Sequence, residues 1–239
     1  MHRKSVKKIS IAIDGPAASG KSTTAKFVAQ RLGYLHIDTG AMYRAVTLKA
    51  LDQKLNLEDQ NIVVALAQST NMHLDIEDGS TKVYLDGTDV TARIRTPLVS
   101  RSVSTVASYQ GVRAVMVREQ QKMAAHGGVV LEGRDIGTIV LPHAELKIFM
   151  VASVEERARR RKKDLALSGN EASETELIKE LEVRDQKDST REVSPLKKAD
   201  DAIELDTSNL TIDEQVDFIV TRANELIQKQ EIVYESNGR

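Results

Sequence analysis

Cysteine is absent from this sequence of 239 residues. Its absence excludes disulfide bonds and thiolate metal sites. The 5 histidines show no spacing typical of metal ligands, so we expect each of them on the surface or in packing. They are His2, His36, His73, His126 and His143.

Long apolar runs and net charge are also lacking. The basic N-terminal residues lead into a short apolar run, residues 9–13, which ends at Asp14. Such a run is too short for the hydrophobic region of a signal peptide or for a membrane span. Lys and Arg (34) nearly balance Asp and Glu (35), which argues against a general nucleic-acid binder. We expect a soluble cytoplasmic protein with no membrane or nucleic-acid partner.

A glycine-bounded loop follows this apolar run. Gly15-x4-Gly20-Lys21-Ser22 has the spacing of a phosphate-binding loop between a strand and a helix. The glycines let successive N–H groups point at phosphate oxygens, and the helix aims its positive dipole end at the same anion. Lys21 is placed to reach the β- and γ-phosphates, and the Ser22 hydroxyl to bind Mg²⁺. The predicted ATP-binding residues are Gly15, Pro16, Ala17, Ala18, Ser19, Gly20, Lys21, Ser22 and Thr23.

Short apolar runs alternate with helical periodicity over most of the chain. This alternation predicts an α/β fold with a parallel sheet. The predicted strands are residues 8–13, 34–37, 129–132, 146–151 and 202–205. The predicted helices are residues 21–32, 41–51, 58–69, 153–167, 174–188 and 212–228, with Thr39 and Ser153 as N-caps of the second and fourth.

The pattern changes between residues 71 and 127. Apolar and polar residues alternate over 72–77 and 82–86, with turns at 78–80 and 86–87, which predicts an antiparallel sheet with one wet face. Helical periodicity then returns, with its apolar positions at Val99, Val103, Val106, Val112, Val115 and Met116. We therefore expect a core domain of residues 1–70 and 128–239 that carries residues 71–127 as a small inserted domain.

Glu132 ends a short apolar strand. An acidic residue at the carboxyl end of a strand beside a phosphate-binding loop is typical of a side chain that holds Mg²⁺, directly or through water. Together with Ser22 it forms the predicted metal site. The alternative is a carboxylate that caps a neighbouring helix.

Arginines form a second group of candidates. Arg44 and Arg134 lie at loop–helix junctions on the edge of the sheet where ligands bind in parallel folds, and arginine suits bidentate phosphate recognition. Two further sets share helix faces: Arg157 with Arg161, and Arg184 with Asp188 and Arg191. For Arg159, Arg160, Lys162 and Lys163 we expect a solvated helix face.

With these motifs in place, the chain resembles bacterial cytidylate kinase nearly from end to end. The resemblance is carried by residues 13–23 (IDGPAASGKST), 38–44 (DTGAMYR), 94–96 (IRT), 132–138 (EGRDIGT), Arg184-Asp185, Asp188, Arg191 and Pro195-Leu196. The first motif indicates only a phosphate-binding-loop kinase. The second and fourth motifs, with the long insert between them, are far more specific to this family.

The resemblance implies a nucleoside-monophosphate-kinase fold with a five-stranded parallel core, an acceptor-binding insert and a mobile helical lid, about residues 153–170. It also implies that ATP and CMP or dCMP react, with Mg²⁺, to give ADP and CDP or dCDP, and we expect a monomer. The implied acceptor-binding residues are Thr39, Arg44, Ser104, Arg113, Arg134, Asp135, Arg184, Asp188 and Arg191. Lys21, Arg134 and the lid residues Arg157 and Arg161 would act on the transferring phosphoryl group. Many relatives have Asp where this chain has Glu132.

Other readings remain open from the residues alone. The acceptor of a kinase with these motifs could be UMP or a hydroxylated metabolite, although Asp135 with Arg113 favours cytosine. A nucleotide-dependent switch would be expected to carry an Asn-Lys-x-Asp stretch, which this sequence lacks. A structural ATP-binding protein would not require so many phosphate-facing arginines. No Ser/His/Asp or Cys/His constellation stands out, and phosphoryl transfer needs none because it depends on alignment and charge neutralisation.

Overall fold

The structure is a computed structural model that describes residues 8–77, 80–167, 169 and 171–237. The basic N-terminal residues 1–7 and residues 78 and 79 of a predicted turn lie outside the described residues. So do residues 168 and 170 at the end of the predicted lid.

The centre of the molecule is a five-stranded sheet in the order β2-β6-β1-β7-β8. Its strands are β1 (Ser10–Asp14), β2 (Leu35–Asp38), β6 (Val129–Gly133), β7 (Leu146–Val151) and β8 (Ile203–Asp206). Every neighbouring pair is parallel. The predicted α/β class and the five-stranded parallel core are therefore confirmed.

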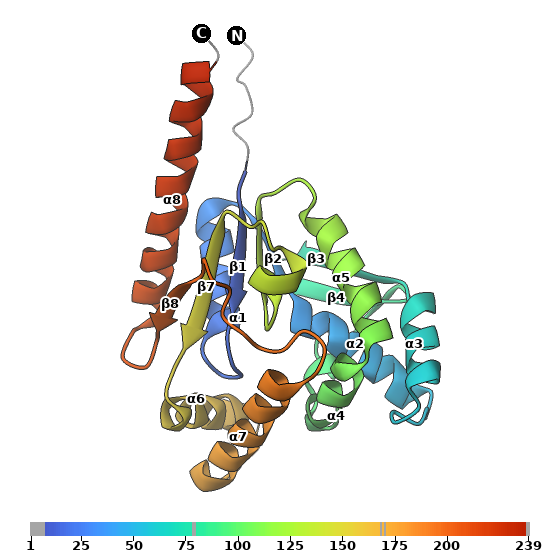
Figure 1. Cartoon of the computed structure of the whole chain (residues 1–239). Helices are drawn as coiled ribbons and strands as arrows, with labels where there is room; N and C mark the ends of the chain where they lie inside the picture. Colours follow the sequence, from blue (N-terminus) through green and yellow to red (C-terminus); the bar gives the residue numbers. More distant parts are fainter. Residues whose placement is uncertain (1–7, 78–79, 168, 170, 238–239) are drawn as a thin grey trace.

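Helices cover both faces of this sheet (Figure 1). α1 (Lys21–Leu32) and α8 (Ile212–Asn237) pack against Ile11 and Ile13 on one face. α2 (Thr39–Asp52) and α5 (Gln110–Ala124) pack with Ala12 and Leu131 on the other. Alternate strand residues supply the two cores because successive side chains of a strand point to opposite faces.

The segment between α2 and β6 contains the predicted antiparallel sheet. Its strands are β3 (Met72–Glu77), β4 (Ser80–Leu85) and β5 (Thr88–Asp89). α3 (Gln60–Ser69) precedes them, and a 3₁₀ turn (Arg93–Arg95) and α4 (Pro97–Ser108) follow. The predicted apolar positions of α4 and α5 are all buried. Because several of them share one hydrophobic cluster with the main sheet, the division at residues 71 and 127 stays a prediction.

The start of α2, the end of α8 and one additional helical turn differ from the prediction. Asp38, not Thr39, caps α2, because its carboxylate accepts a hydrogen bond from Ala41 N at 3.0 Å while Thr39 lies inside the helix. α8 extends to Asn237 instead of residue 228. Residues Ile136–Val140, where no helix was predicted, form one turn of π-helix.

Two further helices lie beyond the carboxyl ends of the strands (Figure 1). These are α6 (Val154–Leu167) and α7 (Glu174–Thr190). Ser153 caps α6 as predicted, with its hydroxyl accepting from Glu156 N at 3.2 Å. No helix in the described part of the chain is long and apolar enough to cross a membrane.

Candidate functional site

A cavity of about 670 Å³ opens at the carboxyl ends of the sheet strands. Most of the predicted site residues line it, although they come from segments far apart in the sequence. They are Ala17 to Thr23, Thr39, Arg44, Ser104, Arg113, Glu132, Arg134, Asp135, Arg161, Arg184, Asp188 and Arg191. The predicted residues Gly15, Pro16 and Arg157 are not among its lining residues.

The loop from Gly15 to Gly20 is one wall of this cavity. Gly15 has φ +148°, and a Cβ there would lie 2.1 Å from the carbonyl oxygen of Met150. Gly20 has φ +94° directly before α1 begins at Lys21. A side chain at either position would strain the backbone, so the two glycines are what allow β1 to turn into α1 beside β7.

Lys21 is buried at the start of α1, with 5% of its surface exposed. Its ammonium group donates hydrogen bonds to Pro16 O at 2.6 Å and Ser19 Oγ at 3.3 Å. Burial, and then the charge of Arg134, lower the pKa of Lys21 to about 7. A phosphate in the loop would supply the negative charge that this lysine lacks.

Ser22 and Glu132 lie together beside the loop. The Ser22 hydroxyl donates to Glu132 Oε2 at 2.7 Å, and the other carboxylate oxygen lies 3.2 Å from His36 Nε2. Thr39 Oγ1 donates to Glu132 O at 2.7 Å, which fixes the end of β6 against α2. Hydroxyl and carboxylate oxygens are ligands that Mg²⁺ prefers. Within the described residues, no cluster of three or more His, Cys, Asp or Glu could hold a metal, so the ion would take its remaining ligands from phosphates and water.

Arg44, Arg134 and Arg184 line the cavity together. Arg44 and Arg184 are half-buried, and the Nε of each is buried without a hydrogen-bond partner among the described residues. Burial and the neighbouring charges of Arg134 and Arg44 lower the pKa of Arg184 to about 10. Arg134 is held by Asp188, whose Oδ2 accepts from its Nε at 2.8 Å. The cluster carries more positive charge than its carboxylate partners neutralise, which is the environment of an anion site.

Asp135 and Arg113, which both line the cavity, form a buried ion pair. The guanidinium of Arg113 lies 5.4 Å above the ring of Tyr43, and Arg191 Nη2 approaches Asp135 Oδ1 at 3.8 Å. Tyr43 is buried, and this burial raises its pKa to about 12, so its hydroxyl stays neutral. Ser104, Val103 and Ala107 of α4 line the same part of the cavity. A flat polar ring would find both an acceptor and a donor here, with apolar walls.

The comparisons with known proteins agree with this geometry. Residues 11–225 match the family model for cytidylate kinase. The chain is 54% identical over 224 residues to cytidylate kinase of Bacillus pumilus, covering 94% of this chain and 99% of that protein. It is 51% identical over 214 residues to cytidylate kinase of Bacillus subtilis, covering 90% and 96%. The chain belongs to the cytidylate kinase family.

Among solved structures, this family member is similar to a protein of Eubacterium ventriosum described as uncharacterized. The two share 13% identity at a TM-score of 0.51, covering 92% of this chain and 99% of that one. At that identity the likeness supports the fold alone.

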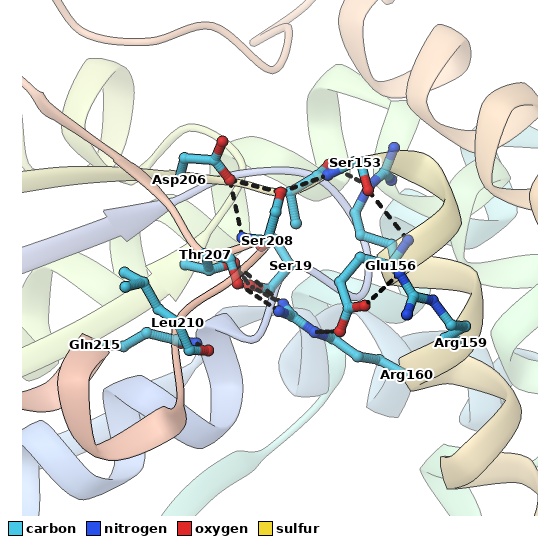
Figure 2. Close-up of polar contacts among 12 residues, drawn as sticks. Ser19, Ser153, Glu156, Arg159, Arg160, Asp206, Thr207, Ser208, Leu210 and Gln215 are labelled. Atoms are coloured by element: carbon cyan, nitrogen blue, oxygen red, sulfur yellow. Dashed lines mark hydrogen bonds and ion pairs between the residues drawn. The ribbon is translucent and has the colours of Figure 1, made fainter.

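Arg160 is a site residue of this cytidylate kinase family member that the sequence prediction placed on the solvated face of α6. It lines the cavity and ties α6 to two loops (Figure 2). Its guanidinium donates to Ser19 O at 3.2 Å, Thr207 Oγ1 at 3.1 Å and Thr207 O at 2.6 Å. Glu156 Oε1 accepts from its Nε at 3.0 Å and orients it. The prediction of a solvated Arg160 is therefore wrong. The helix pattern alone could not reveal these contacts, because Ser19 and Thr207 lie far from Arg160 in the sequence.

Arg157 lies behind the phosphate-binding loop, outside the cavity lining. It is buried, donates to Ala17 O at 3.2 Å and Ala152 O at 3.1 Å, and pairs with Asp185 at 2.7 Å. These contacts join α6, α7 and the loop. Arg161, one turn further along α6, lines the cavity.

The loop between β8 and α8 and the first turn of α8 also line the cavity, although the sequence prediction placed none of their residues in the site. Leu210, Thr211, Ile212 and Gln215 take part, and the Gln215 amide is fixed by Thr24 Oγ1 at 2.7 Å and Leu210 O at 3.0 Å. Their place in the sequence could have indicated this, because they follow the carboxyl end of the last strand, where ligands bind in parallel folds.

Proposed function

We propose that this protein transfers the γ-phosphoryl group of ATP to CMP and dCMP, giving ADP and CDP or dCDP. The observation that carries the proposal is the single cavity that joins three parts. A phosphate-binding loop, a buried Asp135–Arg113 pair and a cluster of arginines all line it. We expect the loop to bind the donor phosphates, the Asp135–Arg113 pair to bind the acceptor base, and the arginines to bind the acceptor phosphate. The cytoplasmic location and the monomeric state stay predictions.

In this proposal, the loop from Gly15 to Thr23 binds the phosphates of ATP. Loop N–H groups and the N-terminus of α1 surround the phosphates, and the Lys21 ammonium turns from Pro16 O toward the β- and γ-oxygens. Ser22 and Glu132 would hold Mg²⁺, which neutralises charge that develops on the phosphoryl oxygens. The residues between β8 and α8, with Arg160, border the remaining space on the donor side.

The arginine cluster would hold the phosphate of the acceptor. Arg44, Arg134 and Arg191 offer planar forks suited to phosphate oxygens, and Arg184 with Asp188 would face the sugar. The protein supplies no covalent nucleophile in this scheme. It aligns an acceptor phosphate oxygen with the γ-phosphorus and stabilises the charge that spreads over the transferring group.

We propose that residues 71–127 form the acceptor-binding part and that residues 153–170 act as a lid. Ser104 and Arg113 of this part, with Asp135, would read cytosine. Arg161 would reach the transferring phosphate when α6 closes. Closure would exclude water from the cavity. Arg157 would hold the loop in place from behind, and Arg160 would hold it from the cavity side.

Base selection tests the acceptor assignment. Cytosine has an exocyclic amine where uracil has a carbonyl oxygen, so the Asp135 carboxylate accepts from the former and opposes the latter. Asp135→Ala should lower kcat/KM for CMP by about 10–100-fold more than kcat/KM for UMP. Steady-state kinetics with both acceptors at saturating ATP gives this ratio, and Asp213→Ala, at an exposed position of α8, is the control. A parallel fall for CMP and UMP would show that Asp135 is structural.

A further inference from the structure

Asp14 is a buried carboxylate that no part of the proposed reaction uses. It is the last residue of β1, directly before the phosphate-binding loop, and 5% of its surface is exposed. Its Oδ1 accepts from Ile136 N at 2.8 Å and its Oδ2 from Gly137 N at 2.7 Å. Both oxygens thus bind the backbone of the two residues that follow Asp135, although Asp14 does not itself line the cavity.

These two N–H groups open the turn of π-helix at Ile136–Val140. Ile139 N and Val140 N bond back to Asp135 O at 2.9 and 3.2 Å, and Leu141 N to Ile136 O at 2.7 Å. The first N–H groups of a helical turn have no partner within it and need an acceptor from outside. The residue in the cap position would ordinarily supply one.

Asp135 occupies that cap position, yet its side chain makes no capping bond. Its carboxylate instead pairs with Arg113 and approaches Arg191. Asp14 binds the N–H groups that Asp135 leaves, so the Asp135 carboxylate is available to the cavity. Two N–H bonds also suit a buried anion, because burial raises the pKa of Asp14 to about 6 while the bonds act to lower it.

We propose that Asp14 is a positioning residue that sets the Asp135 carboxylate for cytosine recognition and fixes it relative to the phosphate-binding loop. This inference rests on the proposed function. It adds a specificity-determining residue outside the cavity, and it gives the donor loop and the acceptor-reading residue one shared anchor. A carboxylate with two acceptor oxygens does this, whereas an amide can accept only one of the two bonds.

The test is Asp14→Asn, with Asp59→Asn as the matched control. Asp59 also accepts two backbone N–H bonds, from Asn61 and Ile62 at 3.1 and 3.2 Å, but both on its Oδ1 and at the half-buried cap position of α3, outside the cavity lining. In D14N the ratio of kcat/KM for CMP to that for UMP should fall about tenfold, because one buried N–H beside Asp135 loses its acceptor. The Kd of ATP, measured by calorimetry, should change less than about threefold in both variants, and D59N should keep the ratio of the unaltered protein.

Combining Asp14→Asn with Asp135→Ala shows whether Asp14 acts through Asp135 or through a general loss of order. If it acts through Asp135, the double variant should have the same ratio of kcat/KM for CMP to kcat/KM for UMP as Asp135→Ala alone. If D14N lowers activity toward both acceptors in parallel, or weakens ATP binding as much as CMP binding, Asp14 is a general structural residue and the proposal is wrong. If D14N does not fold, Asp14→Glu, which keeps both oxygens but displaces them by one methylene, should show the same fall in ratio. An unchanged ratio in D14E would overturn the proposal.

The unaltered protein separates this inference from the proposed function. If it shows no preference for CMP over UMP, the base-reading assignment itself fails. If it shows the preference and D14N retains it, only the role of Asp14 fails. Amide hydrogen exchange gives a second readout, since Ile136 and Gly137 should exchange faster in D14N than in the unaltered protein while the sheet amides do not.

Discussion

Individual arginines in the cavity lower the folding stability of the free protein and favour the binding of an anion. Arg184 is half-buried beside Arg134, Arg44 and Arg161, and its pKa is lowered because desolvation and like charges oppose the ionised form. Such an arrangement costs folding free energy until an anion arrives. A cluster of like-charged, partly desolvated side chains of this kind is therefore evidence for a ligand rather than for a stabilising network.

Arg184→Met tests whether this arginine lowers stability while it supports CMP binding. We expect the variant to melt about 2–4 °C above the unaltered protein, since about 1 kcal/mol of repulsion and desolvation is removed. Its affinity for CMP should fall by at least tenfold at the same time. Differential scanning calorimetry and CMP titration measure both quantities, and Arg118→Met, at an exposed site on α5, is the control. A loss of Tm together with unchanged CMP affinity would contradict this account.

Lys21 leads to a prediction about protons. Burial lowers its pKa to about 7 in the free protein, so part of the population is neutral at pH 8. The phosphates of ATP favour the ammonium form, so binding at pH 8 should take up a proton, and this uptake should decrease as the pH falls below 7. Calorimetry in buffers of different ionisation heat measures this uptake. It should vanish in Lys21→Met and persist in Lys162→Met, which alters an exposed lysine of α6; uptake that persists in Lys21→Met assigns the proton to another group.

Within the single helix α6, arginines one turn apart have different roles. Arg157 joins the helix to Ala17 O and Asp185, whereas Arg161 one turn later faces the cavity. Arg157→Ala should lower Tm by about 5 °C because it leaves buried partners without a donor. Arg161→Ala should keep Tm and lower kcat on the order of 10²-fold, with a smaller effect on CMP affinity. Unaltered turnover in Arg161→Ala would remove α6 from the catalytic account.

The helices, strands and loops show which parts of the structure could be predicted from the sequence. Local patterns predicted the loop from Gly15 to Gly20, the five buried strands and the cap of α6, because each depends on residues near one another in the chain. Periodicity placed Arg157 and Arg161 on one helix face, but α7 and the loop cover Arg157 and leave Arg161 beside the cavity. The partners of Arg160 and Asp14 stand up to 141 and 123 positions away, and no local pattern reports them.

The whole molecule assembles one cavity from segments that run from Ala17 to Gln215. The parallel sheet makes this possible, because the carboxyl ends of all five strands meet at one edge and α4, α6 and α7 close around it. The central claim is that this one cavity holds ATP and a cytosine nucleotide together, so that one phosphoryl group passes between them.

The most direct test of that claim is acceptor-dependent release of ADP from ATP, measured by a coupled assay with CMP, dCMP, UMP, AMP and GMP in turn. We expect CMP and dCMP to stimulate ADP release far above AMP and GMP, with UMP intermediate or low, and with CDP or dCDP formed in equal amount to ADP. Release that is as fast with AMP or GMP as with CMP, or that no acceptor stimulates, would contradict the account.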